Sequence, residues 1–156
     1  MSATRPRAQR GAFPPGTQHY GRSLLGAPLI WFPAPLAGPQ SGLIIAGTHG
    51  DENSSVVTLS CALRTLSPDL RRHHVVLAVN PDGCQLGLRA NANGVDLNRN
   101  FPAANWKQGE TVYRWNSAAE QRDVVLLTGS RPASEPESRA LCQFCLLYTS
   151  DAADDL

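Results

Sequence analysis

Gly42-Leu-Ile-Ile-Ala-Gly47-Thr-His49-Gly-Asp-Glu52 is the stretch that decides the fold. Its apolar run from Leu43 to Ala46 is short and bounded by glycines, which is typical of a buried β-strand. Residues 53–66 follow with apolar side chains at helical spacing, so a helix is predicted there. His49 and Glu52 therefore lie in a strand-to-helix loop. In α/β proteins the carboxyl ends of strands are where ligands bind.

The spacing of His49 and Glu52 allows an imidazole and a carboxylate to close on one metal ion. Imidazole nitrogen and carboxylate oxygen are both good zinc ligands, and a catalytic zinc commonly keeps three protein ligands and a water. We therefore predict that both residues are ligands of a Zn²⁺ ion. The alternative is that His49 is an ordinary loop residue and that Glu52 complements the positive end of the following helix.

A second motif, Asp96-Leu-Asn-Arg-Asn100, places a guanidinium beside a carboxamide. Arg99 offers a rigid fork of donors that matches a carboxylate, and Asn98 adds a neutral donor, so the pair suits a substrate's terminal carboxylate. Arg89 is a candidate for stabilising an oxyanion that develops on a zinc-bound carbonyl. Asp96 is a candidate acceptor that orients a metal-bound imidazole. The plainer alternative is that the arginines are surface residues and that Asn98 forms a turn.

The remaining sequence predicts further elements and one long loop. Residues 1–19 are rich in Pro, Gly and Arg and are expected to form a loosely attached N-terminal arm. The other predictions are strands at 20–26, 27–32, 75–79 and 124–127, a turn at Asn80-Pro-Asp-Gly83, and a loop over 84–123. Ser134-Glu-Pro-Glu137 predicts a helix start, with Ser134 as N-cap and Glu137 as the acid of a capping box.

Composition indicates one globular domain. The chain has 156 residues, 42% of them hydrophobic and 17% charged, which is enough for a real core. The net charge of +1 indicates no strong attraction to nucleic acid or anionic lipid. No stretch approaches the roughly 20 apolar residues of a membrane span, and residues 1–10 lack the apolar core of a secretory signal. We expect a cytoplasmic protein without a nucleic-acid or membrane partner; composition does not indicate an oligomeric state.

Taken together, these motifs resemble those of the zinc carboxypeptidases of the carboxypeptidase A type. That family has His-x-x-Glu after a strand, then Asn-Pro-Asp-Gly, then an arginine ahead of Gly-Val-Asp-x-Asn-Arg-Asn. The corresponding residues of this chain are His49/Glu52, Asn80 to Gly83, Arg89 and Gly94 to Asn100. The resemblance implies an α/β fold, a three-layer α/β/α arrangement with a mixed central sheet, here truncated.

The resemblance also implies a role for each candidate residue. Those roles are zinc ligands for His49 and Glu52, carbonyl polarisation for Arg89, carboxylate binding for Asn98 and Arg99, and support of the histidine ligand for Asp96. One Zn²⁺ per complete domain and metal-assisted hydrolysis are implied. From about Thr4 to Gln143 the chain is most similar to the enterobacterial members that hydrolyse murein tripeptide. Those members act on its γ-D-glutamyl–meso-diaminopimelate bond during wall-peptide recycling in the cytoplasm.

Part of the family's site has no counterpart in the sequence. The family's third ligand is a histidine beyond the predicted last helix, and its general-base glutamate comes later, but no His follows His74 and no Glu follows Glu137. The stretch from Cys145 to Asp155 resembles the translation of a transposon adapter used in DNA library preparation. We therefore expect residues 20–144 to be the N-terminal part of one domain, residues 145–156 to be an artefact tail, and the chain to be inactive alone.

Two other interpretations remain open from the sequence. The chain could be a non-catalytic module of carboxypeptidase type that holds a carboxylate peptide through Asn98 and Arg99. It could also be an unrelated structural domain in which His49, Glu52 and Arg99 never converge. Zinc stoichiometry separates these interpretations from the first, because neither needs a metal.

Overall fold

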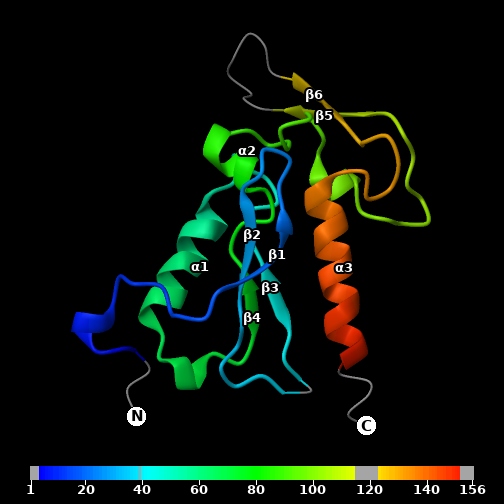
Figure 1. The fold of residues 1–156 in the computed structure, drawn as a ribbon. Helices are drawn as coiled ribbons and strands as arrows, with labels where there is room; N and C mark the ends of the chain where they lie inside the picture. The colour runs from blue at the N-terminus through cyan, green and yellow to red at the C-terminus, as the bar shows by residue number, and fades with distance from the viewer. Residues whose placement is uncertain (1–3, 39, 115–122, 152–156) are drawn as a thin grey trace.

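The computed structural model describes residues 4–38, 40–114 and 123–151. A four-stranded mixed sheet lies at the centre, with strand order β1-β2-β4-β3 (Figure 1). Its strands are β1 (Gln18–Arg22), β2 (Pro28–Phe32), β3 (Leu43–Ile45) and β4 (His74–Val76). The pairs β1/β2 and β2/β4 are antiparallel, whereas β3 runs parallel to β4.

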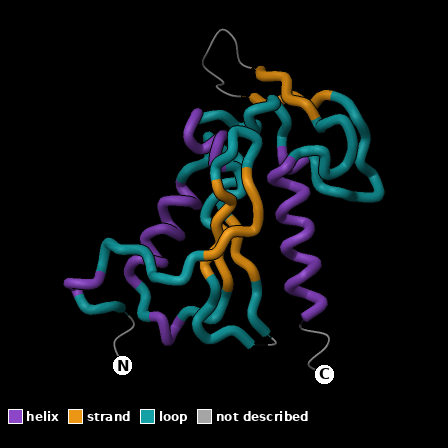
Figure 2. Tube along the Cα trace, in the orientation of Figure 1, coloured by secondary structure: helices purple, strands orange, loops and turns teal. Residues whose placement is uncertain are grey.

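Helices lie on both faces of this sheet, as the tube in Figure 2 shows. The helices are α1 (Ser54–Thr65), α2 (Pro81–Leu86) and α3 (Pro136–Asp151), and the short 3₁₀ turns are η1 (Arg7–Gln9), η2 (Pro68–Leu70) and η3 (Leu97–Arg99). A separate antiparallel hairpin is formed by β5 (Glu110–Arg114) and β6 (Asp123–Leu127). None of the helices within the described ranges is long and apolar enough to cross a membrane.

The alternation of side chains along β4 builds one core on each face of the sheet. Val75 packs with Phe32 and with Leu63 of α1. Val76, which is fully buried, packs with Trp31 and with Phe144 of α3. The predicted three-layer α/β/α arrangement with a mixed sheet is therefore confirmed.

Most of the predicted elements are confirmed with shifted ends: the first two strands, the strand after Gly42, the first helix and the strand at 124–127. The predicted turn at Asn80 is wrong. Asn80 is the N-cap of α2, and its side-chain oxygen accepts a hydrogen bond from the Gly83 amide at 2.8 Å. Asn followed by Pro favours a helix start as well as a turn, so the local sequence did not separate the two. The strand predicted at 75–79 is also shorter and ends at Val76.

The region after α2 is more ordered than predicted. Residues 84–123 contain η3 and β5 rather than one long loop. Along β5 the side chains are exposed or only half-buried, so the strand buries no continuous apolar face. Because hydrophobic periodicity is the main sequence signal for a strand, the sequence of β5 did not predict one.

The predicted cap of the last helix is wrong as well. The helix α3 begins at Pro136, so Ser134 precedes the N-cap position. Glu137 is fully buried, and instead of reaching back to its own helix it accepts a hydrogen bond from the Leu24 amide at 2.8 Å. A long-range partner has therefore replaced the local one that the capping-box pattern predicted.

The N-terminal arm is tied down rather than loose. The Arg5 amide donates to the Thr65 carbonyl at 2.8 Å, and the rings of Phe13 and Phe32 lie 5.4 Å apart. At the other end of the chain, α3 continues to Asp151 past the predicted boundary at residue 145, and residues 152–156 lie outside the described residues. That residues 145–156 are an artefact tail stays a prediction.

Candidate active site

The loop between β3 and α1 is held against the loop that follows α2. The Gly50 amide donates to the Leu88 carbonyl at 2.9 Å. A Cβ atom on Gly50 would overlap the backbone of Gly83, so the close approach of the two loops requires glycine there. This packing buries His49 and fixes where its imidazole points.

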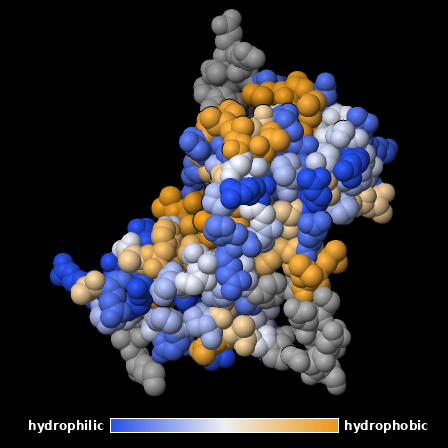
Figure 3. Space-filling view, in the orientation of Figure 1, coloured by the Kyte–Doolittle hydropathy of each residue, from blue (hydrophilic) through white to orange (hydrophobic). Residues whose placement is uncertain are grey.

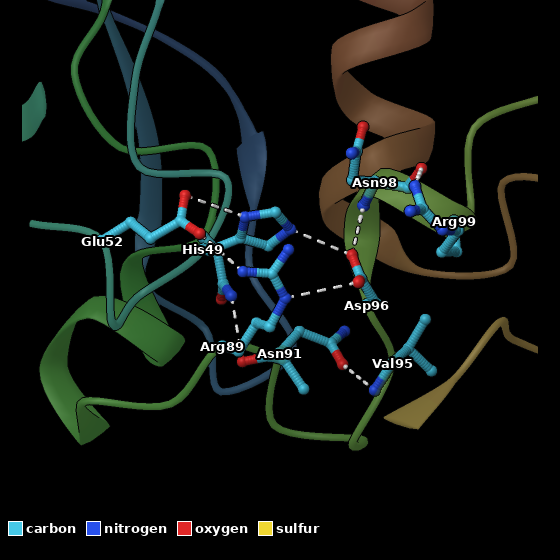
Figure 4. Close-up of polar contacts among 10 residues, drawn as sticks. His49, Glu52, Arg89, Asn91, Val95, Asp96, Asn98 and Arg99 are labelled. Carbon is cyan, nitrogen blue, oxygen red and sulfur yellow. Dashed lines mark hydrogen bonds and ion pairs between the residues drawn. The ribbon is translucent and has the colours of Figure 1, made fainter. Parts of the chain in front are cut away.

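His49 lies between two carboxylates, as Figure 4 shows. Its Nδ1 is 3.2 Å from Oε2 of Glu52, and its Nε2 is 3.0 Å from Oδ1 of Asp96. With Asp96 as acceptor for the Nε2 proton, the neutral form of the ring would offer its Nδ1 lone pair to a metal ion next to Oε2 of Glu52. The imidazole and the Glu52 carboxylate therefore present two donor atoms to one point, with Asp96 behind the ring as predicted.

Arg89 completes this cluster from the opposite side of Glu52. Its Nη1 donates to Oε1 of Glu52 at 2.6 Å, and its Nε lies 3.6 Å from Oδ2 of Asp96, an ion pair without a hydrogen bond. The guanidinium carbon lies 4.1 Å from the centre of the Tyr113 ring, within the range of a cation–π contact. The two oxygens of Glu52 are thus divided between Arg89 and His49.

The cluster holds both carboxylates in their charged form. For Asp96, burial favours the neutral acid, but hydrogen bonding to His49 and the nearby positive charges outweigh it, so its pKa is lowered. In the same way, burial of Glu52 is outweighed by its hydrogen bonds with Arg89 and His49, and its pKa is lowered. The hydrogen bond to Asp96 raises the pKa of His49 more than burial lowers it.

These residues fit two of the ligands of a zinc ion. Nδ1 of His49 and Oε2 of Glu52 are donor types that zinc prefers, and Asp96 supplies the acceptor that metal-bound histidines usually have behind them. Within residues 4–38, 40–114 and 123–151, no group of three His, Cys, Asp or Glu side chains could hold a metal ion. A third ligand is not among them.

The predicted substrate-binding residues, Asn98 and Arg99, line a common cavity, and Asn98 also borders the cavity at His49. Asn98 lines a cavity of about 230 Å³ together with His49 and Glu52. Arg99 lines an adjoining cavity of about 380 Å³, of which Asn98 is also a wall. Arg89 lines neither of these two and instead borders a third cavity with Tyr113. Asn98 is therefore the wall between the cavities of His49 and Arg99, whereas Arg89 meets the cluster through its contact with Glu52.

The turn η3 explains why Asn98 borders the cavity at His49 and Arg99 does not. Successive side chains of a 3₁₀ turn point about 120° apart, so Arg99 lies outside the cavity at His49 although it shares the second cavity with Asn98. In Figure 4 the Arg99 side chain lies beyond Asp96 as seen from His49. The Asn98 amide donates to Oδ1 of Asp96 at 2.9 Å, so the start of η3 is fixed to the same oxygen that contacts the imidazole.

Two buried asparagines outside the predicted site, Asn91 and Asn100, hold this segment in place. Oδ1 of Asn91 accepts from the Val95 amide at 3.1 Å, and its Nδ2 donates to Glu137 at 3.1 Å. Asn100 is fully buried, and its Nδ2 donates to the Thr128 carbonyl at 2.9 Å. The many asparagines between residues 91 and 105 were the available signal, but nothing local shows which of them are buried.

Comparison with known proteins identifies the class that this fold and site define. A sequence profile described as zinc carboxypeptidase matches residues 16–152. The chain therefore belongs to the zinc carboxypeptidase family, in agreement with the resemblance of its motifs.

Within this family, the chain is similar to several murein peptide amidases. The chain is 87% identical to murein peptide amidase A of Escherichia coli strain K12 over 143 residues, covering 92% of this chain and 59% of that protein. It is 54% identical to murein peptide amidase A of Vibrio campbellii, covering 87% of this chain and 55% of that protein. The crystal structure of a murein-tripeptide amidase from E. coli O157 matches with a TM-score of 0.90 and 83% identity, over 96% of this chain and 63% of that one. The chain spans less than two thirds of each.

Proposed function

We propose that this chain carries part of the active site of a zinc-dependent amidase. The proposed reaction is hydrolysis of the γ-D-glutamyl–meso-diaminopimelate bond of murein tripeptide, a step in the recycling of wall peptides. The observation that carries the proposal is the pairing of His49 Nδ1 with Glu52 Oε2 at 3.2 Å, with Asp96 on the other ring nitrogen. The 87% identity to a murein peptide amidase supports the substrate.

Each residue of the site has a role in this proposal. His49 and Glu52 would hold one Zn²⁺, which when bound supplies a Lewis acid and lowers the pKa of water. Asp96 keeps the His49 ring in the tautomer that offers Nδ1. Arg89, next to Glu52, brings a fixed positive charge to where the scissile carbonyl would lie. Asn98 and Arg99 would bind the carboxylate of the substrate's C-terminal side.

The proposed binding partner and cellular location of the protein follow from this substrate. The ligand is a small peptide, and neither nucleic acid nor a membrane has a role in the reaction. A recycled wall peptide is processed in the cytoplasm, so we propose that location. The net charge of +1 agrees with a partner that is recognised by a few local charges rather than by a basic surface.

One observation favours a second function for the chain by itself. No third metal-ligating side chain joins His49 and Glu52 among the described residues. Binding of a carboxylate peptide at Asn98 and Arg99 needs no metal, so the chain alone would bind substrate without hydrolysing it.

The test compares this chain with the amidase from E. coli K12. We expect the chain to bind Zn²⁺ more weakly than the relative, and to release no diaminopimelate from L-alanyl-γ-D-glutamyl-meso-diaminopimelate. Exchanging His49 for Ala or Glu52 for Gln should remove the zinc binding of the chain. The matching substitutions should abolish both zinc binding and turnover in the relative. Unchanged zinc binding in both variants of the chain would show that its ligands are misassigned.

A further inference from the structure

The cavity next to the metal-ligand cavity has residues that the proposed function does not use. It encloses about 380 Å³, and Asn98 is the wall that it shares with the cavity at His49. Its lining residues are Asn98, Arg99, Phe101, Ala103, Asn105, Trp106, Lys107 and Thr128. Of these, Trp106 and Lys107 have no role in the proposed reaction so far.

The polar groups around this cavity are mostly hydrogen-bond donors. Arg99 and Lys107, the single lysine of the sequence, are cations, and no carboxylate is among the described residues that line the cavity. Nε1 of Trp106 is buried and has no hydrogen-bond partner within the described part of the chain. A buried N–H without an acceptor is unfavourable, so the site favours a ligand that brings acceptor oxygens and negative charge.

The segment that carries Trp106 and Lys107 is held in place by the buried Thr128. Its hydroxyl donates to the Lys107 carbonyl at 3.0 Å and accepts from the Gly109 amide at 2.9 Å. The Trp106 amide donates to the Ala103 carbonyl at 3.0 Å. The backbone on both sides of the indole is therefore fixed before any ligand arrives, which lowers the entropic cost of binding.

We propose that this cavity binds the distal carboxylate of the substrate's diaminopimelate residue, through Nε1 of Trp106 and the ammonium group of Lys107. This inference rests on the proposed function. Diaminopimelate carries one carboxylate beside the scissile amide and a second at the far end of its side chain. Asn98 and Arg99 bind the first carboxylate, and Trp106 and Lys107, which line the same cavity as Arg99, bind the second.

The consequence is a preference for diaminopimelate over lysine. L-Lysine resembles diaminopimelate but lacks the distal carboxylate. A site that hydrogen-bonds a particular substrate group rejects an analogue without that group strongly, because its own buried polar atoms are then left unpaired. With L-lysine bound, Nε1 of Trp106 would stay without an acceptor and Lys107 without a counter-charge.

The test uses the indole N–H resonance of Trp106 in the ¹⁵N-labelled full chain, assigned with the Trp106→Phe variant. Adding meso-diaminopimelate should shift this resonance with saturation, and L-lysine should bind at least about tenfold more weakly. Lys107→Gln should weaken diaminopimelate binding about tenfold without changing L-lysine binding. The control Arg114→Gln removes one exposed positive charge outside the cavity lining and should leave both affinities unchanged. Lys107 is itself exposed, so its variant should fold normally.

Equal affinity for the two amino acids, or no shift of the Trp106 resonance, would overturn the inference. A Lys107→Gln variant that binds diaminopimelate as tightly as the original chain would also overturn it. These outcomes are distinct from failure of the proposed function, which is measured as zinc binding by the chain and by its His49→Ala and Glu52→Gln variants. Loss of zinc binding in those variants without selective diaminopimelate binding contradicts this inference alone, whereas selective binding with zinc binding unchanged in both variants contradicts the proposed function alone.

Discussion

At the scale of single residues, Asp96 links the metal ligand to the substrate-binding turn. One of its oxygens lies 3.0 Å from Nε2 of His49 and 2.9 Å from the Asn98 amide that donates to it. Its second oxygen faces the guanidinium of Arg89. A buried carboxylate in this position sets the imidazole tautomer and the start of η3 together.

We expect Asp96→Asn to weaken zinc binding about 10- to 100-fold, because the imidazole loses its negatively charged acceptor. The measurement is a competition titration with a zinc chelator on the chain and on the same substitution in the amidase from E. coli K12. The exposed Asp69 offers a control, since Asp69→Asn makes the same charge change in η2. Equal zinc affinity of Asp96→Asn and Asp69→Asn would contradict the role of Asp96.

His74 makes the stability of the domain dependent on pH. Its Nδ1 accepts a hydrogen bond from the Ala34 amide at 3.0 Å, and burial lowers its pKa below the ordinary value of 6.5. The unfolded chain therefore binds the proton more readily than the folded one does. Its neutral form stabilises the fold above about pH 6.5, and that stability is lost as the pH falls toward the lowered pKa.

We expect the free energy of unfolding to fall between pH 7.5 and about 5.5 less steeply in His74→Asn than in the original chain. Asparagine keeps an acceptor near the Ala34 amide but cannot take up a proton. Urea unfolding at the two pH values measures the difference. Protonation of His49 acts in the opposite direction, because its pKa is raised, but it cancels when the two proteins are compared. Identical pH profiles would rule out the role of His74.

At the scale of elements, the start of α3 is joined to distant loops through Glu137. One carboxylate oxygen accepts from the Leu24 amide at 2.8 Å, and the other accepts from Nδ2 of Asn91 at 3.1 Å. The turn after β1 and the segment before η3 thus meet at one fully buried side chain. Because Asn91 also orders the Val95 amide, α3 helps to place the segment that carries Asp96.

We expect Glu137→Ala to lower the free energy of unfolding by about 2–4 kcal/mol, since each buried donor left without an acceptor costs about 1–3 kcal/mol. The measurement is urea unfolding followed by circular dichroism. Glu110→Ala on the exposed face of β5 provides the control and should change stability by less than about 0.5 kcal/mol. A loss of similar size in both variants would show that the network around Glu137 is not special.

At the scale of the whole molecule, apolar side chains of the described residues remain exposed in several places, and two of these places involve strands. Figure 3 shows one over α2 and the β5–β6 hairpin, where Leu86, Val112 and Val125 are exposed. The other is β3, which ends the sheet and, within the described residues, pairs only with β4. Ile44 and Ile45 on this edge are 40% and 46% exposed. By contrast β4 is covered, since its Val75 and Val76 are buried.

We expect the chain to self-associate through the edge of β3, because an exposed apolar edge strand templates pairing with another copy. Ile44→Lys should shift the sedimentation profile toward the monomer. Val57→Lys, on an exposed position of α1, adds the same charge away from the edge and should leave the profile unchanged. Equal effects of the two lysines would attribute any change to net charge instead.

The sequence alone determined the family of the protein and the strand, loop and helix that carry the two metal-ligand candidates. Strand, loop and helix around His49 and Glu52 are contiguous, so periodicity and the two-residue gap between the ligands were enough to place both donors at the end of β3. Tertiary structure decided what these residues contact. Arg89 reaches Glu52 from 37 positions away, and Asp96 reaches His49 from 47. The separation of Arg99 from His49 and the burial of Glu137 depend on such contacts as well. The physical reason is that local patterns report helix and strand faces, whereas hydrogen-bond partners distant in sequence become neighbours only when the layers pack.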